Sequence, residues 1–281
     1  MKPARFDYAR AGSAEEAFSL LHEYGEEAVA LAGGQSLLAM MNMRLADPAV
    51  VVDLSDCTEL DFARVAGDRV EIGAMFRQAA LERWHGTQTH LPLLSSMLPY
   101  IGHYQTRARG TIGGSMAHAD PSAEIPLAAV TMGAEVVLRS VRGERRVAAR
   151  DFFLGPLDTE RDPDELIWSV SFPSYDHWAG MAFEEVAYRH GDFAIAAFAA
   201  VADADTVVLG VGGVAGRPTV FEWPRAALED IDAELAGAAR ELEVLSDHHA
   251  DDHYRRRLLR SVAPNVLARA VSAASRRGSE S

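Results

Sequence analysis

The first fifty residues alternate between helical and strand-like patterns of apolar positions. Ser13-Ala14-Glu15-Glu16 has the form of a capping box, and apolar residues then recur at helical spacing up to Gly25, which ends the helix. Apolar strands are predicted over 28–32 and 50–54, with a short helical pattern over 37–43 between them. This order predicts a compact β-α-β unit of about fifty residues, which is too small to fold alone.

The middle of the chain mixes the two periods over a longer stretch. Strands are predicted over 70–74, 134–139 and 166–172, and helices over 78–84, 92–101 and 125–132. The stretch from 102 to Ser115 is rich in Arg and Gly and shows neither period, so we expect a loop there.

The last third of the chain is strand-like first and helical afterwards. Strands are predicted over 193–202 and 207–211, and helices over 226–235, 253–262 and 264–274, with Pro264 opening the last helix. Strands followed by helices favour an α+β fold over a doubly wound sheet. We divide the chain into three segments, 1–55, 56–174 and 175–281.

Composition places the chain among globular proteins. Of 281 residues, 48% are apolar and 24% are charged, which excludes disorder and collagen. The longest apolar run, 193–202, is about half as long as a bilayer crossing requires, and the first residues show no signal-peptide pattern. The single cysteine, Cys57, excludes an internal disulfide and favours a cytoplasmic location. It also excludes an iron–sulfur cluster held by this chain alone.

The charge balance argues against a nucleic-acid partner. The net charge is −14, and binding to nucleic acid requires a basic face that displaces counterions. The densest basic stretch, Arg255 to Arg257 with Arg260, lies beside several aspartates. We interpret it as a solvated helix face.

The first candidate site is the segment Leu31-Ala32-Gly33-Gly34-Gln35-Ser36-Leu37, where a buried strand leads through two glycines into a helix start. Glycines let backbone N–H groups approach an anion closely, and Ser36 is a candidate for both N-cap and phosphate donor. By itself the motif fits a tight packing turn equally well.

A second glycine segment, Gly110-Thr111-Ile112-Gly113-Gly114-Ser115-Met116-Ala117, strengthens the binding interpretation. A pyrophosphate has enough oxygens for two facing sets of backbone donors, whereas one phosphate has few. Two such segments about eighty residues apart therefore suggest a dinucleotide gripped between two subdomains.

Other motifs favour structural roles. The glycines from Gly210 to Gly216 follow a strand but lead into Arg-Pro rather than a helix, so we interpret them as a strand end or bulge. His248, His249 and His253 lie in a charged stretch with no second ligand cluster, which argues against a metal site. Cys57 has no basic neighbour that would favour a thiolate.

Both glycine segments, together with His118-Ala119-Asp120-Pro121 and Arg189-His190-Gly191-Asp192-Phe193, resemble the flavin subunit of molybdenum hydroxylases. The chain is similar to the medium subunits of aerobic carbon monoxide dehydrogenase and of bacterial N-heterocycle hydroxylases, and to the FAD subunits of the xanthine dehydrogenase family. The resemblance implies two FAD-binding subdomains of the vanillyl-alcohol oxidase type, 1–55 and 56–174. A C-terminal α+β domain, with a sheet and helices, would follow at 175–281.

The resemblance also implies which residues bind FAD, without a covalent bond. Residues 32–36 and 111–115 would hold the pyrophosphate, Asp120 and Glu124 would face the sugar and ribityl hydroxyls, and Asp192 with Phe193 would lie near the isoalloxazine. The expected cofactor-binding set is Ala32, Gly33, Gly34, Gln35, Ser36, Leu37, Gly110, Thr111, Ile112, Gly113, Gly114, Ser115, His118, Asp120, Glu124, Ile167, Asp192 and Phe193.

Two positions depart from the family pattern. Many relatives have Tyr at Phe193, so a phenol hydroxyl is missing here. Related eukaryotic xanthine enzymes have a Lys near the flavin where this chain has Glu184, which argues against NAD as the electron acceptor. We expect a quinone, a cytochrome or oxygen as the acceptor instead.

The family resemblance implies an electron-transfer role within a larger enzyme. A large subunit would hold molybdopterin and substrate, a small one would hold two [2Fe–2S] clusters, and the assembly would be an (αβγ)₂ hexamer. FAD would pass electrons from the clusters to an external acceptor. Two alternatives remain: a self-sufficient FAD oxidase or reductase of the vanillyl-alcohol oxidase fold, and a flavin-free binding module.

Overall fold

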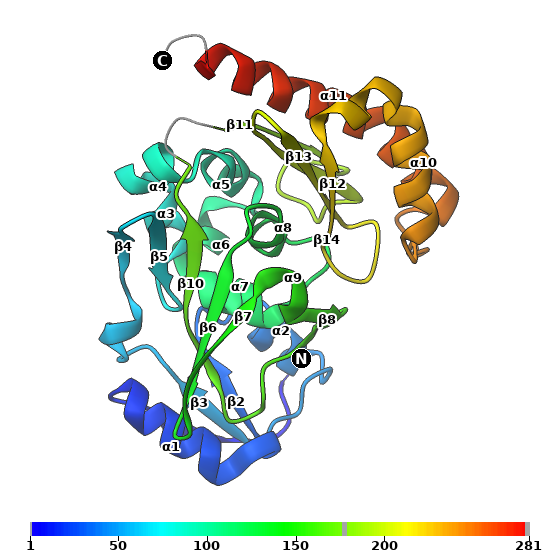
Figure 1. Cartoon of the computed structure of the whole chain (residues 1–281). Coiled ribbons are helices and arrows are strands. Elements are labelled where there is room, and N and C mark those ends of the chain that lie inside the picture. Colours follow the sequence, from blue (N-terminus) through cyan, green and yellow to red (C-terminus); the bar gives the residue numbers. More distant parts are fainter. Residues whose placement is uncertain (1, 176–178, 279–281) are drawn as a thin grey trace.

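The computed structural model describes residues 2–175 and 179–278, and three sheets with their covering helices follow one another along the chain (Figure 1). The α-helices are α1 (Ala14–Tyr24), α2 (Leu37–Asn42), α3 (Gln78–Arg83), α4 (His85–His90), α5 (Pro92–Met97), α6 (Tyr104–Arg109), α7 (Ile112–His118), α8 (Glu124–Thr131), α9 (Ala149–Phe152), α10 (Ile231–Glu241) and α11 (Asp252–Gly278). Short 3₁₀ helices cover Gly25–Glu27, Thr58–Leu60, Leu98–Tyr100 and Arg225–Asp230.

The first sheet is parallel, with the order β1-β3-β2. Its strands are β1 (Asp7–Arg10), β2 (Ala28–Leu31) and β3 (Val50–Asp53). The first half of the predicted capping box forms, because Glu16 N–H donates to Ser13 Oγ at 3.2 Å, while the Glu16 carboxylate accepts at 2.8 Å from the N–H of Gly12, one residue before the N-cap. Gly25 ends α1 with a φ of +52°. The β-α-β unit predicted from the sequence is therefore present, with the unpredicted β1 added at one edge.

The second sheet is antiparallel, with the order β4-β5-β10-β6-β7. Its strands are β4 (Ala63–Ala66), β5 (Arg69–Gly73), β6 (Glu135–Ser140), β7 (Gly143–Ala148) and β10 (Leu166–Pro173). A small ribbon, β8 (Phe153–Gly155) with β9 (Asp158–Thr159), follows α9. The central strand β10 joins two hairpins, so residues far apart in sequence share one sheet.

The third sheet is an antiparallel meander of four strands in sequence order. It contains β11 (Gly180–Val186), β12 (Ala196–Ala202), β13 (Thr206–Gly212) and β14 (Thr219–Pro224). Helices α10 and α11 cover one face, and α8 packs against the other (Figure 1). Gly210 of β13 allows this approach, because a Cβ there would overlap Thr131 of α8.

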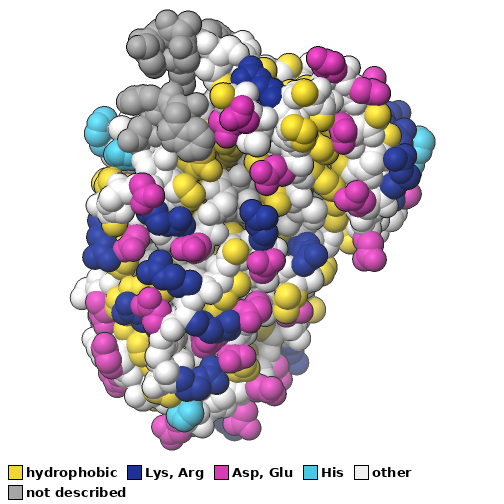
Figure 2. All heavy atoms as spheres, in the orientation of Figure 1, with side chains coloured by type: hydrophobic (Ala, Val, Ile, Leu, Met, Phe, Trp, Pro, Cys, Tyr) yellow, Lys and Arg dark blue, Asp and Glu magenta, His cyan; other side chains and the backbone are white. Residues whose placement is uncertain are grey.

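Positive and negative side chains are mixed on the molecular face shown in Figure 2. The predicted solvated basic face at 255–260 is wrong for Arg255, which is 3% exposed. Its guanidinium donates to the carbonyls of Ile195, Leu245 and Ala250 and forms an ion pair with Asp247 at 2.8 Å. Arg255 therefore ties α11 to the end of the loop before β12 and to the segment that precedes α11.

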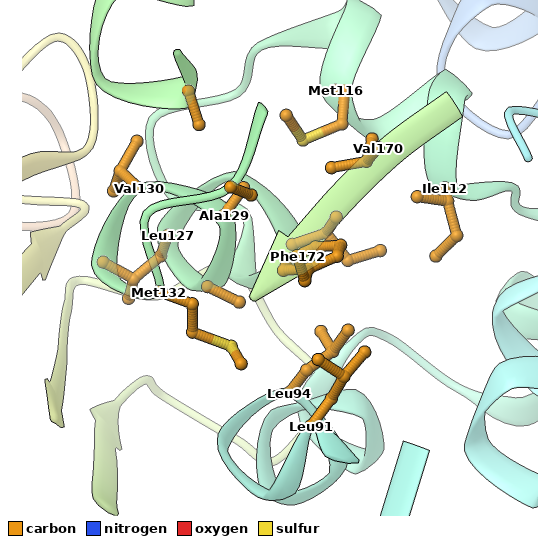
Figure 3. Close-up of a cluster of buried hydrophobic side chains, with 14 of the residues drawn as sticks. Leu91, Leu94, Ile112, Met116, Leu127, Ala129, Val130, Met132, Val170 and Phe172 are labelled. Carbon is orange, nitrogen blue, oxygen red and sulfur yellow. The ribbon is translucent and has the colours of Figure 1, made fainter. Parts of the chain in front are cut away.

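A large apolar core joins the second and third sheets. Leu91 before α5 and Leu94 within it, Met116 of α7 and Leu127 of α8 lie on different sides of Phe172 of β10 (Figure 3). The same buried cluster continues to Ala197, Ala199 and Val201 of β12. Side chains from 70 to 201 thus form one continuous core.

Several predicted boundaries are wrong. The stretch up to Ser115 that we expected to be a loop contains α6 and the start of α7. The sequence does not predict α7 because its paired glycines are poor helix formers, and packing stabilises the helix. Pro264 lies inside α11 instead of starting a helix. The helix predicted over 92–101 ends at Met97 and continues as a 3₁₀ turn, and the buried strand predicted from 193 begins at Ala196.

No helix among the described residues is long and apolar enough to cross a membrane. Within the same residues, no group of three or more His, Cys, Asp or Glu side chains is arranged to hold a metal ion. The rings of His248 and His249 lie against each other, with their centroids 3.7 Å apart and their planes tilted by 43°. Cys57 is buried, and burial raises its pKa to about 11.

Candidate cofactor-binding site

One cleft of about 630 Å³ collects nearly all the predicted site residues. Both glycine segments line it, together with His118, Asp120 and Glu124, Ile167 of β10, and Asp192 with Phe193. The two segments touch: a Cβ on Gly33 would overlap the carbonyl of Arg109 and approach Gly110. A side chain at position 33 would therefore separate the two segments or close the cleft between them.

The first glycine segment presents a run of unused backbone donors. Among the residues that the structure describes, no acceptor receives a hydrogen bond from the amide N–H groups of residues 33–37. Gly34 has a φ of +71°, which places successive amides on one side of the turn. Ser36 does not cap α2 with its side chain, contrary to our expectation, so its hydroxyl stays available in the cleft. This arrangement is suited to an anion with several oxygens.

The second segment differs from the first, because most of its amides are already paired. Gly113 N–H donates to Ala74 O at 2.9 Å, and Gly114 N–H donates to Thr111 Oγ1 at 3.0 Å, which caps α7. Gly113 packs so closely on Ala74 that a Cβ would overlap it. The second segment therefore supplies hydroxyls and a surface without side chains, and the expected second set of free amides is wrong.

Ile112 does not belong to the cleft. Its side chain is fully buried in the core between α7 and β10, as Figure 3 shows, and its amide N–H donates to Phe76 O at 3.1 Å. The motif placed it among the binding residues, but the α7 helix turns its side chain away from the cleft. Every other residue of the expected set lines the cleft.

The third segment contributes the loop from Gly191 to Phe193 at the rim of the cleft. Phe193 is 74% exposed, so its ring is open to solvent in this structure. We expected Glu184 near the flavin, but it does not line the cleft. It lies on the face of β11 that packs against α11, where it forms an ion pair with Arg269 at 2.8 Å.

The cleft wall at α8 carries the carboxyls of Asp120 and Glu124, whereas Glu185 of β11 does not line the cleft. Glu124 is 8% exposed, and burial together with the nearby charge of Glu185 raises its pKa to about 8. Burial also raises the pKa of Glu185 to about 7. Asp120 is fixed just before α8, where its Oδ1 accepts from Ser122 N–H at 2.8 Å.

The unpredicted polar residues of the cleft include Gln78 and Arg161. Gln78 is buried, and its Oε1 has no hydrogen-bond partner among the described residues. Arg161 lines the cleft and donates through Nη1 to the carbonyls of Asp162, Pro163 and Glu165. A buried acceptor without a partner beside a glycine segment indicates that the cleft is built for a polar molecule.

Comparison with known proteins agrees with this geometry. A family model described as the FAD binding domain in molybdopterin dehydrogenase matches residues 4–175. The chain belongs to this family. The family's cofactor fits the cleft on three observations: the unused amides at 33–37, the approach at Gly33 that excludes a side chain, and the unpartnered Gln78 oxygen.

Known relatives match the whole chain. The 6-hydroxypseudooxynicotine dehydrogenase complex subunit alpha of Paenarthrobacter nicotinovorans is 34% identical and covers 96% of each chain. The caffeine dehydrogenase subunit beta of a Pseudomonas species is also 34% identical, with 96% of each chain covered. The carbon monoxide dehydrogenase of Hydrogenophaga pseudoflava contains a chain that matches with a TM-score of 0.87, 32% identity and 99% coverage of both.

These similarities confirm the predicted α+β class and the predicted kind of protein. The chain is an FAD-binding oxidoreductase subunit of the molybdenum hydroxylase family. The flavin-free binding module considered from the sequence is therefore wrong.

Proposed function

We propose that the chain carries one non-covalently bound FAD in the cleft and relays electrons from the [2Fe–2S] clusters of a partner subunit to an external acceptor. The observation that carries this proposal is the meeting of the two glycine segments in a single cleft lined by all expected binding residues except Ile112. Bound FAD supplies the redox chemistry, and the protein supplies binding and orientation.

Different residues of the cleft contact different parts of the cofactor in this proposal. The free amides of 33–37 and the hydroxyls of Ser36 and Ser115 bind the pyrophosphate, in this proposal, with Gly114 leaving room for it. Asp120 and Glu124 lie along one wall, where they can accept from or donate to sugar and ribityl hydroxyls. His118 and Ile167 complete the wall, and Asp192 with Phe193 lies at the rim beside the ring system.

Partner subunits follow from the relatives. Their names describe subunits of dehydrogenases, and the compared carbon monoxide dehydrogenase is a form that lacks the Mo-pyranopterin moiety of its molybdenum cofactor. We therefore propose a large molybdopterin subunit and a small iron–sulfur subunit as partners, assembled as (αβγ)₂. One buried thiol and no second cysteine fit a cytoplasmic enzyme.

The division of the chain into three domains is part of this proposal. The FAD-binding subdomains are 1–55 and 56–174, and each has its own sheet, while 175–281 is the C-terminal domain with the third sheet. The argument against NAD from Glu184 no longer applies, because that carboxylate pairs with Arg269 away from the cleft. The exposed Phe193 leaves the rim open to an acceptor of any of the proposed kinds.

The test is the release of the flavin from the purified complex. Acid precipitation is expected to leave all yellow colour in the supernatant, where chromatography identifies it as FAD, because Cys57 is buried and does not line the cleft. Colour retained in the protein pellet would show a covalent flavin, and a supernatant containing FMN or no flavin would contradict the assignment of the cleft.

A further inference from the structure

We infer that Arg161 is a cofactor-binding residue, which holds the adenosine diphosphate half of FAD through its positive charge. The inference rests on the proposed function and deepens it, because it names the side chain that recognises one half of the cofactor. Arg161 lies in the turn between β9 and β10, outside both glycine segments, and no motif of the sequence indicated it.

The charges of the cleft single out this residue. Arg161 is the only lysine or arginine among the described residues that line the cleft. The acidic side chains of the lining are Asp120, Glu124, Glu165 and Asp192. Both phosphates of a pyrophosphate are negatively charged, so a lining whose other charged side chains are acidic would repel them. One cation in such a place has a large effect on the affinity for an anion.

The contacts of Arg161 leave part of its guanidinium available. Nη1 donates to the carbonyls of Asp162 at 2.9 Å, Pro163 at 3.4 Å and Glu165 at 2.7 Å. Within the part of the chain that the structure describes, Nε and Nη2 donate to no acceptor. The protein therefore fixes one nitrogen of the guanidinium and leaves the donors of the other two for a ligand.

The positive charge of Arg161 has no ion-pair partner among the described residues, because other arginines hold the carboxylates of its turn. Asp162 Oδ2 lies 2.8 Å from Arg142 Nη2. Glu165 Oε2 lies 2.6 Å from Arg145 Nη2. Burial lowers the pKa of Arg161 in spite of these nearby carboxylates, which means that its charge is poorly hydrated. An anion in the cleft would stabilise it.

Arg161 lies at the end of the cleft that the first sheet forms. Its guanidinium donates to the carbonyl just before Leu166, and Leu166 shares the core of the first sheet with Leu54. Both leucines line the cleft, together with residues 29–30 of β2. Because β2 leads directly into the free amides of 33–37, this apolar surface lies beside the proposed pyrophosphate site. It suits a flat base attached to that pyrophosphate.

The flavin half of the cofactor has a different place in the proposed function, beside residues 192–193. The adjoining Gly191 lies against Gly102, because a Cβ on Gly191 would overlap the Gly102 carbonyl. Ile101 also lines the cleft here, and it packs on the core that the second and third sheets share. The end of the cleft at the first sheet is therefore left for adenosine.

The test measures the dissociation constants of FAD and ADP for the apoprotein of the full chain, FAD by fluorescence titration and ADP by competition with FAD. Arg161→Gln removes the charge but keeps an N–H donor for the carbonyls, and it should weaken the binding of both ligands about tenfold. Arg161→Lys keeps the charge and should bind both within about threefold of wild type. Unchanged affinities in Arg161→Gln, or an equal loss in Arg161→Lys, would overturn the inference.

Arg142→Gln is the matched control. It removes the ion pairs with Asp162 and Asp164 in the same turn, and Arg142 does not line the cleft. It should keep the wild-type affinities. The same loss as in Arg161→Gln would mean that the order of the turn sets the affinity, which would contradict a role of the Arg161 charge. Should Arg161→Gln not fold, Arg161→Met is the second uncharged variant, with the same expected loss.

The use of ADP separates this inference from the proposed function. If the apoprotein binds ADP with an affinity that depends on Arg161 but does not bind FAD, the proposed function fails and the recognition of adenosine diphosphate stands. If FAD binds and Arg161→Gln equals wild type for both ligands, the inference fails and the proposed function stands. A loss for FAD without a loss for ADP would also overturn the inference, because Arg161 would then act on the flavin half.

Discussion

Gly114 lies where the two glycine segments face each other, so Gly114→Val tests the cleft at a single residue. A Cβ there would lie 2.8 Å from Thr111 Oγ1 and 3.7 Å from the Ala32 Cβ, and the two methyls of Val would extend into the space between the segments. FAD affinity should fall at least about tenfold, the effect of one lost strong contact. Fluorescence titration measures it, and an unchanged far-UV spectrum checks the fold.

Gly237→Val is the control for this substitution. Gly237 also lies in a helix, and the nearest atom to its added Cβ is 3.9 Å away on Arg240, far from the cleft. It should keep the wild-type affinity. Full FAD occupancy in a folded Gly114→Val protein would remove the second glycine segment from the binding site.

Single residues differ in how far the sequence reveals them. Ser13 and Gly25 were predictable, because capping and left-handed backbone are local properties. The directions in which the Ile112 and Glu184 side chains point were not predictable, because each depends on a partner from another element. Ile112 packs into the core beside β10, and Glu184 pairs with Arg269 of α11. A motif gives the positions of a binding segment, but the helix or strand around each position decides where its side chain points.

Among the elements, α11 depends on Arg255 for its attachment to the third sheet. Arg255→Met keeps the length of the side chain but removes the guanidinium donor from three carbonyls and the ion-pair partner from Asp247 Oδ2. We expect a loss of about 2–4 kcal/mol in the free energy of unfolding. Urea denaturation measures it as a lower midpoint with an unchanged m value.

Arg260→Met serves as the comparison for Arg255→Met, because Arg260 lies in the same helix and is exposed. It should change the midpoint little. An equal effect of the two substitutions would mean that the stabilisation comes from helix α11 itself rather than from the contacts of Arg255.

The elements with a strong apolar period were predictable, and those stabilised by tertiary contacts were not. The strands of the third sheet are nearly all apolar and were found, although their ends were misplaced. Helix α7 was missed because Gly113 and Gly114 are poor helix formers. It is stabilised by the Thr111 cap and by its packing on Ala74, and the second of these is not visible in the sequence.

At the scale of the whole molecule, the cleft connects parts that share few other contacts. The first sheet has its own core, which meets the rest of the chain through residues such as Met75 and Leu166. The second and third sheets share one core around α8. A ligand that spans the cleft therefore links the small first unit to the remainder, so binding and stability are coupled.

This coupling predicts that FAD raises the melting temperature of the apoprotein and that FMN raises it much less. FAD at about a hundred times its dissociation constant contributes about 2.7 kcal/mol, and a chain of this size then melts about 5 °C higher. FMN has one phosphate and no adenosine, so it cannot use both glycine segments together with the wall formed by Ile167 and Arg161. Differential scanning fluorimetry with equal concentrations of each flavin measures the two shifts, and limited proteolysis shows whether the first unit is protected. Equal shifts for the two flavins would mean that the cleft binds only the ring and one phosphate, and that the two glycine segments do not share a pyrophosphate.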